Sequence, residues 1–306
     1  MSPSIASSGI EPVLYSGWLR RTVESLFSVL FPSDCRICGL PLLNISRLPV
    51  CPECLASIEP IRGKVCSICG ERVLSSYAVC DDDGLRRCPG CHRVDRPFER
   101  AAAHGSYDRG LPELIHLPKF HGVTPAADVL VRMLAEAIEK LDLGDTVLVV
   151  PVPRYRSKRR QRGFNQAELI VRTSIKASPS RERLQLAPGI LLRIRDTQSQ
   201  IGLTSHQRRE NLRGAFSVAR AAEVNGREVL LVDDVYTTGT TASECARVLR
   251  RGGASKVFVA TVARTLKPAS NTEGFEVSEF QGFKNSPVSG ESNETLAPEH
   301  LETSKP

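Results

Sequence analysis

Residues 230–241 read Leu-Leu-Val-Asp-Asp-Val-Tyr-Thr-Thr-Gly-Thr-Thr, and this stretch decides the fold. The apolar run at 229–232 is typical of a strand buried in a parallel sheet. Residues 242–251 have helical character, and Gly252 and Gly253 end that pattern. The stretch therefore predicts a strand, a turn rich in hydroxyl groups, and a helix.

The predicted turn has the chemistry of a sugar-phosphate site. Unpaired N–H groups and the positive end of the dipole face the turn at the start of a helix. A glycine there allows close approach, and threonine hydroxyls add donors. The candidate phosphate-binding residues are Thr237, Thr238, Gly239, Thr240 and Thr241. Asp233 and Asp234 come just before them, where carboxylates can accept hydrogen bonds from ribose hydroxyls or hold the water shell of Mg²⁺.

These residues resemble the phosphoribosyl pyrophosphate (PRPP) motif of the type I phosphoribosyltransferases, a hydrophobic strand followed by Asp-Asp and a Thr-Thr-Gly-x-Thr loop. The resemblance implies an α/β fold with a doubly wound, mostly parallel sheet, and a site for PRPP with Mg²⁺. It also implies that Asp233 and Asp234 are the catalytic residues, which stabilise positive charge on the ribose while pyrophosphate leaves. The alternative is a buried strand followed by an Asp cap and an ordinary turn.

The cysteines predict a separate metal-binding module. Nine of the ten lie between residues 35 and 91, and eight of these form four Cys-x-x-Cys pairs: Cys35/Cys38, Cys51/Cys54, Cys66/Cys69 and Cys88/Cys91. Sequential pairing gives two closed Cys₄ sites, which are typical of structural zinc. Disulfides are the alternative, but a chain without an export signal keeps its thiols reduced. Cys80 or His92 could replace a ligand in the second site, and Cys245 is expected in the core.

A second strand is predicted at 147–150, where Pro151 and Pro153 end an apolar run. Six basic residues follow between 154 and 162, at the end of a parallel strand where open α/β sheets bind ligands. The alternative is that this basic run is an ordinary solvated segment of the chain. If the site turns over, Arg154, Arg162 or Lys119 would neutralise the pyrophosphate together with Mg²⁺.

A narrower resemblance is to the ComF family of competence-associated phosphoribosyltransferase-like proteins, and it covers roughly residues 18–266. Its signature is Pro-Val-Pro at 151–153 followed by Arg-Gly-Phe-Asn-Gln at 162–166. Further matches are Tyr107, Pro118-Lys119-Phe120, Phe31-Pro32 before the cysteines, and Gln200, Leu203, Arg208, Asn211 and Phe216. The family implies a double zinc ribbon and a role in competence and DNA uptake. It also implies that residues 193–216 form a flexible hood over PRPP, the alternative being a mobile loop.

The remaining pattern completes the predicted organisation. One helix is expected from residue 124, with an apolar face that reaches Leu141, and a second over 165–172. A strand is expected at 257–262 and a surface connection at 174–188. The predicted parts are an amphipathic segment at 1–32, the double zinc ribbon at 33–97, the phosphoribosyltransferase-like domain at 98–266 and a disordered tail at 267–306.

Charge and hydropathy bear on partners and location. The 306 residues carry a net charge of +7. Residues 267–306 hold seven Glu against three Lys, so the rest of the chain carries +11, which suits phosphate-bearing partners. No apolar stretch approaches the roughly 20 residues needed to span a bilayer, so we expect a cytoplasmic protein. The amphipathic residues 18–31 would pack on the protein or lie on the inner membrane surface.

Three functions agree with this sequence. The first is a phosphoribosyltransferase with an unknown acceptor. The second is a non-catalytic protein that binds single-stranded DNA through the zinc ribbons and the 154–162 segment, with proteins of the DNA-uptake machinery as partners. The third is a PRPP-sensing regulator, which ranks last because the sequence has no recognisable helix-turn-helix.

Overall fold

The computed structural model describes residues 34–42, 47–73, 79–80, 84–121, 124–153, 166–198 and 202–267. The predicted amphipathic segment at 18–31, the basic segment at 154–162 and the tail after residue 267 lie outside the described residues.

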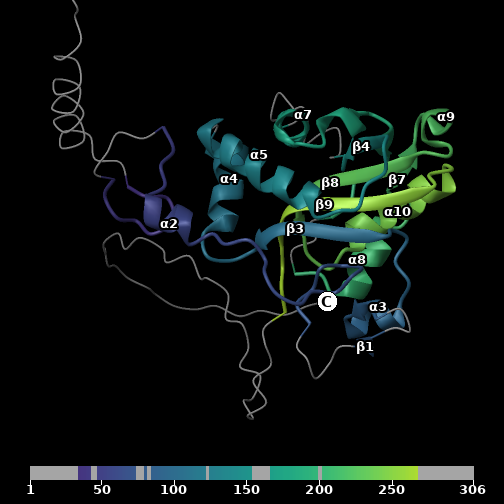
Figure 1. Cartoon of the computed structure of the whole chain (residues 1–306), viewed down its shortest axis with the longest axis horizontal. Helices are drawn as coiled ribbons and strands as arrows, with labels where there is room; N and C mark the ends of the chain where they lie inside the picture. The colour runs from purple at the N-terminus through teal and green to yellow at the C-terminus, as the bar shows by residue number, and fades with distance from the viewer. Residues whose placement is uncertain are drawn as a thin grey trace, which may run out of the picture. The chain divides into compact units, whose positions relative to one another are not determined.

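A parallel sheet of five strands forms the centre of the described chain (Figure 1). The strand order is β3-β9-β8-β4-β5, and every neighbouring pair is parallel. The strands are β3 (Arg100–Ser106), β4 (Val147–Pro151), β5 (Leu184–Leu186), β8 (Glu228–Tyr236) and β9 (Lys256–Arg264). The chain moves outward from β4 to β5 and then returns to β8 on the other side of β4, so the strand order reverses between β4 and β8.

Alternating side chains of the strands feed two separate cores, which is what period-2 geometry requires of a sheet buried on both faces. On β8, Leu230 and Val232 pack into one core, while Val229 and Leu231 pack into the other. The first core is covered by α4 (Leu111–His121), α5 (Thr124–Glu139) and α7 (Gln166–Ala177). Helices on both faces confirm the predicted doubly wound α/β class.

The second core is covered by α10 (Thr240–Arg251), which connects β8 to β9. Its buried residues are Ala242, Cys245, Ala246 and Leu249. Cys245 is fully buried, so the prediction of a core thiol is confirmed. The helix ends at Gly252, as predicted. The short helix α9 (Ala221–Val224) precedes β8 on the same side.

The segment after β5 forms a small unit over the second core. Strands β6 (Leu191–Arg193) and β7 (Phe216–Val218) pair antiparallel, and α8 (Ser205–Leu212) lies between them in the sequence. A capping box formed by Thr204 and Gln207 begins α8. Residues 193–216 are therefore built around a strand pair and a capped helix, with 199–201 outside the described residues. We use the name hood below for residues 191–218, which contain the predicted segment 193–216 and the whole of its strand pair.

The prediction of a surface connection at 174–188 was wrong. Helix α7 continues to Ala177, where Ser174 and Ser178 are buried, and a 3₁₀ turn at Arg181–Arg183 leads into β5. This strand pairs with β4 from Val147↔Leu184 to Val149↔Leu186 and forms an edge of the sheet. Its three residues, Leu-Gln-Leu, are too few to give a hydrophobic period that sequence reasoning can recognise.

The cysteine module has short elements: α2 (Pro52–Ala56), β1 (Val79–Cys80), β2 (Arg86–Arg87) and α3 (Pro89–Arg93). Its two halves pack with different cores. Cys35, Leu42 and Val50 join the core under α4 and α5. Cys66, Val73 and Cys91 join the core under α10. In the part of the chain described here, no helix has the length and apolar character needed to cross a bilayer.

Candidate functional site

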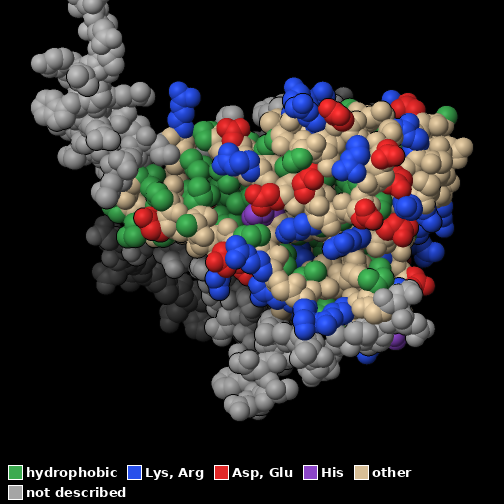
Figure 2. Space-filling view, viewed as in Figure 1, with side chains coloured by type: hydrophobic (Ala, Val, Ile, Leu, Met, Phe, Trp, Pro, Cys, Tyr) green, Lys and Arg blue, Asp and Glu red, His purple; other side chains and the backbone are tan. Residues whose placement is uncertain are grey.

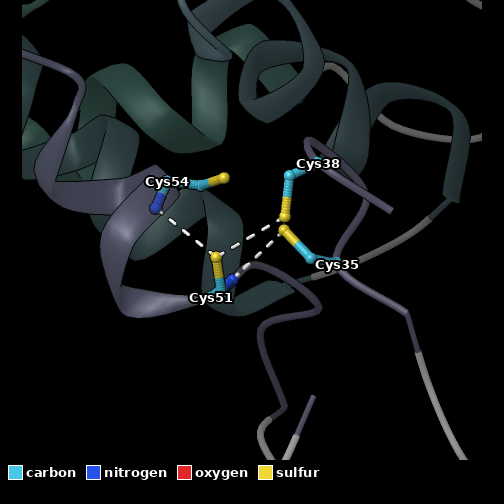
Figure 3. Close-up of side chains that lie close together, drawn as sticks. All are labelled: Cys35, Cys38, Cys51 and Cys54. Atoms are coloured by element: carbon cyan, nitrogen blue, oxygen red, sulfur yellow. Dashed lines mark hydrogen bonds between the residues drawn. The ribbon is translucent and has the colours of Figure 1, made fainter. Parts of the chain in front are cut away.

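The first cysteine cluster brings together Cys35, Cys38, Cys51 and Cys54, whose sulfurs lie within 4.8 Å of one another. Figure 3 shows the four sulfurs turned toward a common centre. Cys51 is the N-cap of α2, and its sulfur accepts the backbone N–H of Cys54 at 3.4 Å, while Cys35 Sγ accepts the N–H of Cys51 at 3.3 Å. Burial raises the pKa of Cys35, but donated backbone N–H groups outweigh it and lower that pKa to about 6. Such donors favour the thiolate form that binds metals.

The second cluster consists of Cys66, Cys69, Cys88 and Cys91, and all four are buried. The Cys66–Cys69 turn lies against the sheet. A Cβ on Gly70 would come within 3.1 Å of the Ala101 carbonyl oxygen on β3, and the Ala101 N–H donates to the Ile68 carbonyl at 2.7 Å. The second cluster is therefore fixed to β3 by its backbone.

Both clusters fit structural zinc. Sulfurs bound tetrahedrally at about 2.3 Å from Zn²⁺ are about 3.8 Å apart. Cys38 Sγ and Cys51 Sγ are 3.8 Å apart, and Cys69 Sγ and Cys88 Sγ are 3.6 Å apart. The predicted sequential pairing is confirmed by these groupings. His92 is exposed and joins neither cluster, and the side chain of Cys80 lies outside the described residues.

The predicted phosphate loop connects β8 to α10. Gly239 is the N-cap of α10 and has φ 74°, the left-handed conformation that glycine adopts without steric cost. The Thr238 and Thr240 hydroxyl oxygens are 2.8 Å apart across the turn, and Thr237 is exposed. The first turn of a helix has N–H groups without partners within the helix. Thr237 to Thr241 thus lie where a helix start, a left-handed glycine and hydroxyl groups meet.

The predicted strand ended at residue 232, which placed Asp233 and Asp234 after it. In the structure both residues lie within β8. The strand continues because β9 pairs with it from Asp233↔Thr261 to Tyr236↔Arg264. Asp233 Oδ1 accepts the N–H of Asp234 at 3.0 Å, and Asp234 Oδ1 accepts that of Val235 at 2.9 Å. Both carboxylates are half-buried, at the carboxyl end of a strand beside the point where the strand order reverses, where α/β sheets bind ligands.

The hood reaches the phosphate loop through α8. Arg208 Nη1 donates to Thr237 Oγ1 at 3.5 Å, and Arg208 Nε donates to the Leu203 carbonyl at 2.9 Å. Asn211 exchanges hydrogen bonds with the backbone of Gln198 at 3.0 and 3.2 Å. Phe216 begins β7 of the hood and is buried in the second core. Four of the residues that carry the ComF resemblance in this region, Leu203, Arg208, Asn211 and Phe216, therefore hold the hood together and connect it to the loop.

Sequence reasoning missed Tyr236, which lies directly beneath Gly239. A Cβ added to Gly239 would fall on the Tyr236 ring. The ring meets Phe98 edge to face at 6.4 Å, and the Arg264 guanidinium lies 5.1 Å from its centroid. The ring is buried, and burial is the main reason that its pKa is raised above the usual value. The phosphate loop therefore rests on a buried aromatic side chain.

Sequence reasoning also missed a basic groove beside the loop. Arginines line it from the end of the cysteine module, from the hood and from α10: Arg96, Arg209, Arg213, Arg247 and Arg251. The signal was present on α10, because Ser243, Arg247 and Arg251 recur every four residues on the face opposite the buried one. Three predicted anion-binding residues are untested, because Arg154, Arg162 and the side chain of Lys119 lie outside the described residues.

Comparisons with known proteins agree with both the cysteine module and the domain built on the parallel sheet. Competence protein F of Haemophilus influenzae is 30% identical over 230 residues, which cover 70% of this chain and 96% of that protein. The DNA utilization protein YhgH of Escherichia coli K12 is 32% identical over 216 residues, or 66% of this chain and 91% of that one. The chain belongs to the ComF family.

A more distant ComF relative is competence protein ComFC of Bacillus subtilis, which is 26% identical over 71% of this chain and 84% of its own. Two family models match: a double zinc ribbon domain at residues 26–83 and a phosphoribosyl transferase domain at 185–288. The first match ends before Cys88 and Cys91, which the structure nevertheless brings to Cys66 and Cys69. A solved hypoxanthine phosphoribosyltransferase from Staphylococcus aureus also matches, at 15% identity over 47% of this chain and 68% of that one, with a TM-score of 0.28.

Proposed function

We propose that this ComF protein binds PRPP with Mg²⁺ at the carboxyl end of β8. The 5′-phosphate would lie in the loop from Thr237 to Thr241, and Asp233 and Asp234 would hold the ribose hydroxyls. The main support for this proposal is that two half-buried carboxylates lie beside the start of a helix whose N-cap is a left-handed glycine. The matched phosphoribosyl transferase domain includes both parts. A phosphate monoester and a vicinal diol are then bound by one β-strand and the helix after it.

Mg²⁺ suits the same end of the sheet. It prefers oxygen ligands and keeps several of its waters, so one or two carboxylates together with phosphate oxygens are enough to hold it. Asp233 and Asp234 are acidic groups of that kind, and each is oriented by a backbone N–H of the following residue. When bound, Mg²⁺ would neutralise charge on the pyrophosphate. The anion-binding candidates Lys119, Arg154 and Arg162 would add to this neutralisation.

If the bound PRPP reacts, the C1–oxygen bond to pyrophosphate breaks and a bond from C1 to the acceptor forms. Positive charge then develops on the ribose ring, and carboxylates beside it stabilise that charge. The protein's contribution would be to position the sugar phosphate and to supply this field. The names of the relatives, Competence protein F and DNA utilization protein, support a role for the reaction or the binding in competence and DNA uptake.

Calorimetric titration of the zinc-loaded full chain with PRPP and Mg²⁺ tests the proposal. In the Asp233→Asn/Asp234→Asn variant we expect binding to weaken at least about 100-fold, because two charged hydrogen bonds each contribute about 1.5–3 kcal/mol. The matched control is Asp128→Asn/Asp142→Asn, which removes the same charge at two exposed positions. Equal PRPP affinity in the two double variants would refute the assignment of Asp233 and Asp234. Binding in the parent justifies a screen of acceptors for pyrophosphate release.

A further inference from the structure

Arg208 lies on the face of α8 that packs against the body of the protein. It precedes Leu212 by four residues, and residues four apart share one face of a helix. The Leu212 side chain is fully buried, whereas Arg209, the next residue after Arg208, is exposed. The Arg208 side chain is partly buried. Its position on the helix therefore differs from that of the neighbouring surface arginine.

The helix that carries Arg208 is held in place at both ends. The capping box begins it. At its other end, Arg195 Nη2 donates to the carbonyl oxygen of Asn211 at 2.9 Å. The Gly214 N–H then donates to Glu244 Oε1 on α10 at 3.0 Å. The hood helix is thus attached to the helix that follows the phosphate loop, so Arg208 meets the loop from a fixed support.

The guanidinium group of Arg208 is oriented by one short hydrogen bond and reaches the loop by a long one. Nε donates to the Leu203 carbonyl at 2.9 Å, and Nη1 donates to Thr237 Oγ1 at 3.5 Å. A well-formed N–H···O bond is about 2.7–3.2 Å long, so the contact with Thr237 is weak. Thr237 is exposed, so a ligand in the loop can reach this hydroxyl and the guanidinium beside it.

The positive charge of Arg208 is not compensated by an acidic side chain. Within the described part of the chain, Arg208 makes no ion pair and no side-chain hydrogen bond beyond these two. Over the face drawn in Figure 2, by contrast, Lys and Arg side chains are interleaved with Asp and Glu. The start of α10 lies two residues after Thr237, and the positive end of a helix dipole favours an anion over a further cation. The guanidinium and the helix start both favour an anion bound here.

The free edge of the guanidinium fits one phosphate group. Because Nε is engaged by Leu203, the edge formed by Nη1 and Nη2 remains for a ligand. Two nitrogens on one edge can donate to two oxygens of the same phosphate, which is the geometry that makes arginine a preferred phosphate-binding side chain. Its neighbour Thr237 is the first residue of the proposed 5′-phosphate loop, so the 5′-phosphate is the group within reach.

We infer that Arg208 binds the 5′-phosphate of PRPP, exchanging its long contact with Thr237 for hydrogen bonds to phosphate oxygens. The inference rests on the proposed function, and it adds a ligand-binding residue that comes from the hood and not from the loop. A sugar without a 5′-phosphate would leave the guanidinium without this partner. Arg208 therefore makes affinity depend on the 5′-phosphate.

The test is calorimetric titration of the zinc-loaded full chain with three ligands, each with Mg²⁺: PRPP, ribose 5-phosphate and pyrophosphate. Arg208→Gln should weaken binding of PRPP and of ribose 5-phosphate by the same factor, at least about tenfold, because hydrogen bonds between charged groups are lost. Pyrophosphate has no 5′-phosphate, so its affinity should remain parental. Arg208→Lys keeps the charge but lacks the planar fork, so its affinity for both sugar phosphates should lie between those of Arg208→Gln and the parent.

Arg132→Gln is the control, because Arg132 is an exposed arginine on α5, on the opposite face of the sheet. It should leave all three affinities unchanged. Parental affinity of Arg208→Gln for ribose 5-phosphate would overturn the inference. An equal loss of affinity for pyrophosphate would also overturn it, because the whole site would then be damaged. A parent that binds none of the three ligands would overturn the proposed function as well, so the two failures are distinguishable.

Discussion

Arg264 and Glu71 form a buried ion pair with 2.7 Å between Arg264 Nη2 and Glu71 Oε2, although 192 residues lie between them in the chain. Arg264 ends β9 and is 3% exposed, and Glu71 lies two residues after Cys69, which belongs to the first Cys-x-x-Cys pair of the second cluster. Arg264 Nη1 also donates to the carbonyl oxygen of Cys69. The same guanidinium lies over the Tyr236 ring. One arginine thus contacts both a zinc-binding turn and the aromatic ring beneath the phosphate loop.

Removing one partner of this pair should be costly. Arg264→Met leaves the Glu71 carboxylate buried without a counter-charge, and such losses destabilise proteins by about 3–5 kcal/mol. The double variant Glu71→Gln/Arg264→Met should recover part of this loss because no unpaired charge remains. Urea unfolding of the zinc-loaded proteins, followed by circular dichroism, gives the free energies. A double variant no more stable than Arg264→Met would show that the carboxylate is not what makes the single change costly.

Gly239→Ala should disrupt the phosphate loop. The new Cβ would fall on the Tyr236 ring, so either the ring or the loop must move. Gly226→Ala is the matched control, because Gly226 has φ 71° with no heavy atom near the added Cβ and lies at the other end of β8. Both variants carry the backbone cost of about 1 kcal/mol. Only Gly239→Ala should also weaken PRPP binding, by at least about tenfold. Equal PRPP affinities, measured by calorimetry, would mean that the loop position does not matter for binding.

The two metal centres should differ in their effect on the rest of the protein. Cys51→Ser and Cys66→Ser should each reduce zinc from two ions per chain to one, because a Cys₃ site loses most of its affinity and folding of each module depends on its metal. Cys66→Ser should also weaken PRPP binding, since Arg264 connects that cluster to Tyr236. Cys51→Ser should not. Elemental analysis after gel filtration gives the zinc content.

Cys245→Ala is the control for those two variants, because the Cys245 thiol is fully buried outside both clusters. It should retain two zinc ions. If Cys51→Ser and Cys66→Ser reduce PRPP affinity equally, the contacts of Arg264 do not couple the second cluster to the loop.

Much of this architecture could be predicted from residues close together in the sequence. The β8 and β9 strands, the helix between them and the pairing of the cysteines all follow from periodicity, from punctuation by glycine and proline, and from spacing. The strand at Leu184–Leu186 was missed because a three-residue edge strand carries no period. The extension of β8 through Asp233 and Asp234 was missed because its partner, β9, supplies the pairing.

The parts of the site that could not be predicted from the sequence share one physical cause. Tyr236 lies within the motif at 230–241, but its role depends on Phe98 and Arg264, which the fold brings to its ring from distant positions. The basic groove likewise combines Arg96 with two segments more than 100 residues away. Charged residues scattered along a sequence look like ordinary solvated positions until the topology places them together.

His104 should make the stability of the protein depend on pH. It is buried on β3, with Nδ1 3.0 Å from Glu136 Oε2 on α5 and with Lys140 also close. Burial lowers the pKa of His104, Glu136 opposes this, and Lys140 adds to it, so the net shift is downward. The folded state therefore favours the neutral imidazole. The resulting contribution to the stability of the folded state is present above the unfolded pKa of about 6.5 and is lost as the pH falls through the folded pKa.

Between pH 7.5 and pH 5.5, the free energy of unfolding should fall more steeply for the parent than for His104→Gln, by at most about 1.4 kcal/mol per pH unit. Zinc release at low pH affects both proteins alike, so the difference isolates His104, and parallel pH profiles would show that its protonation is not coupled to folding.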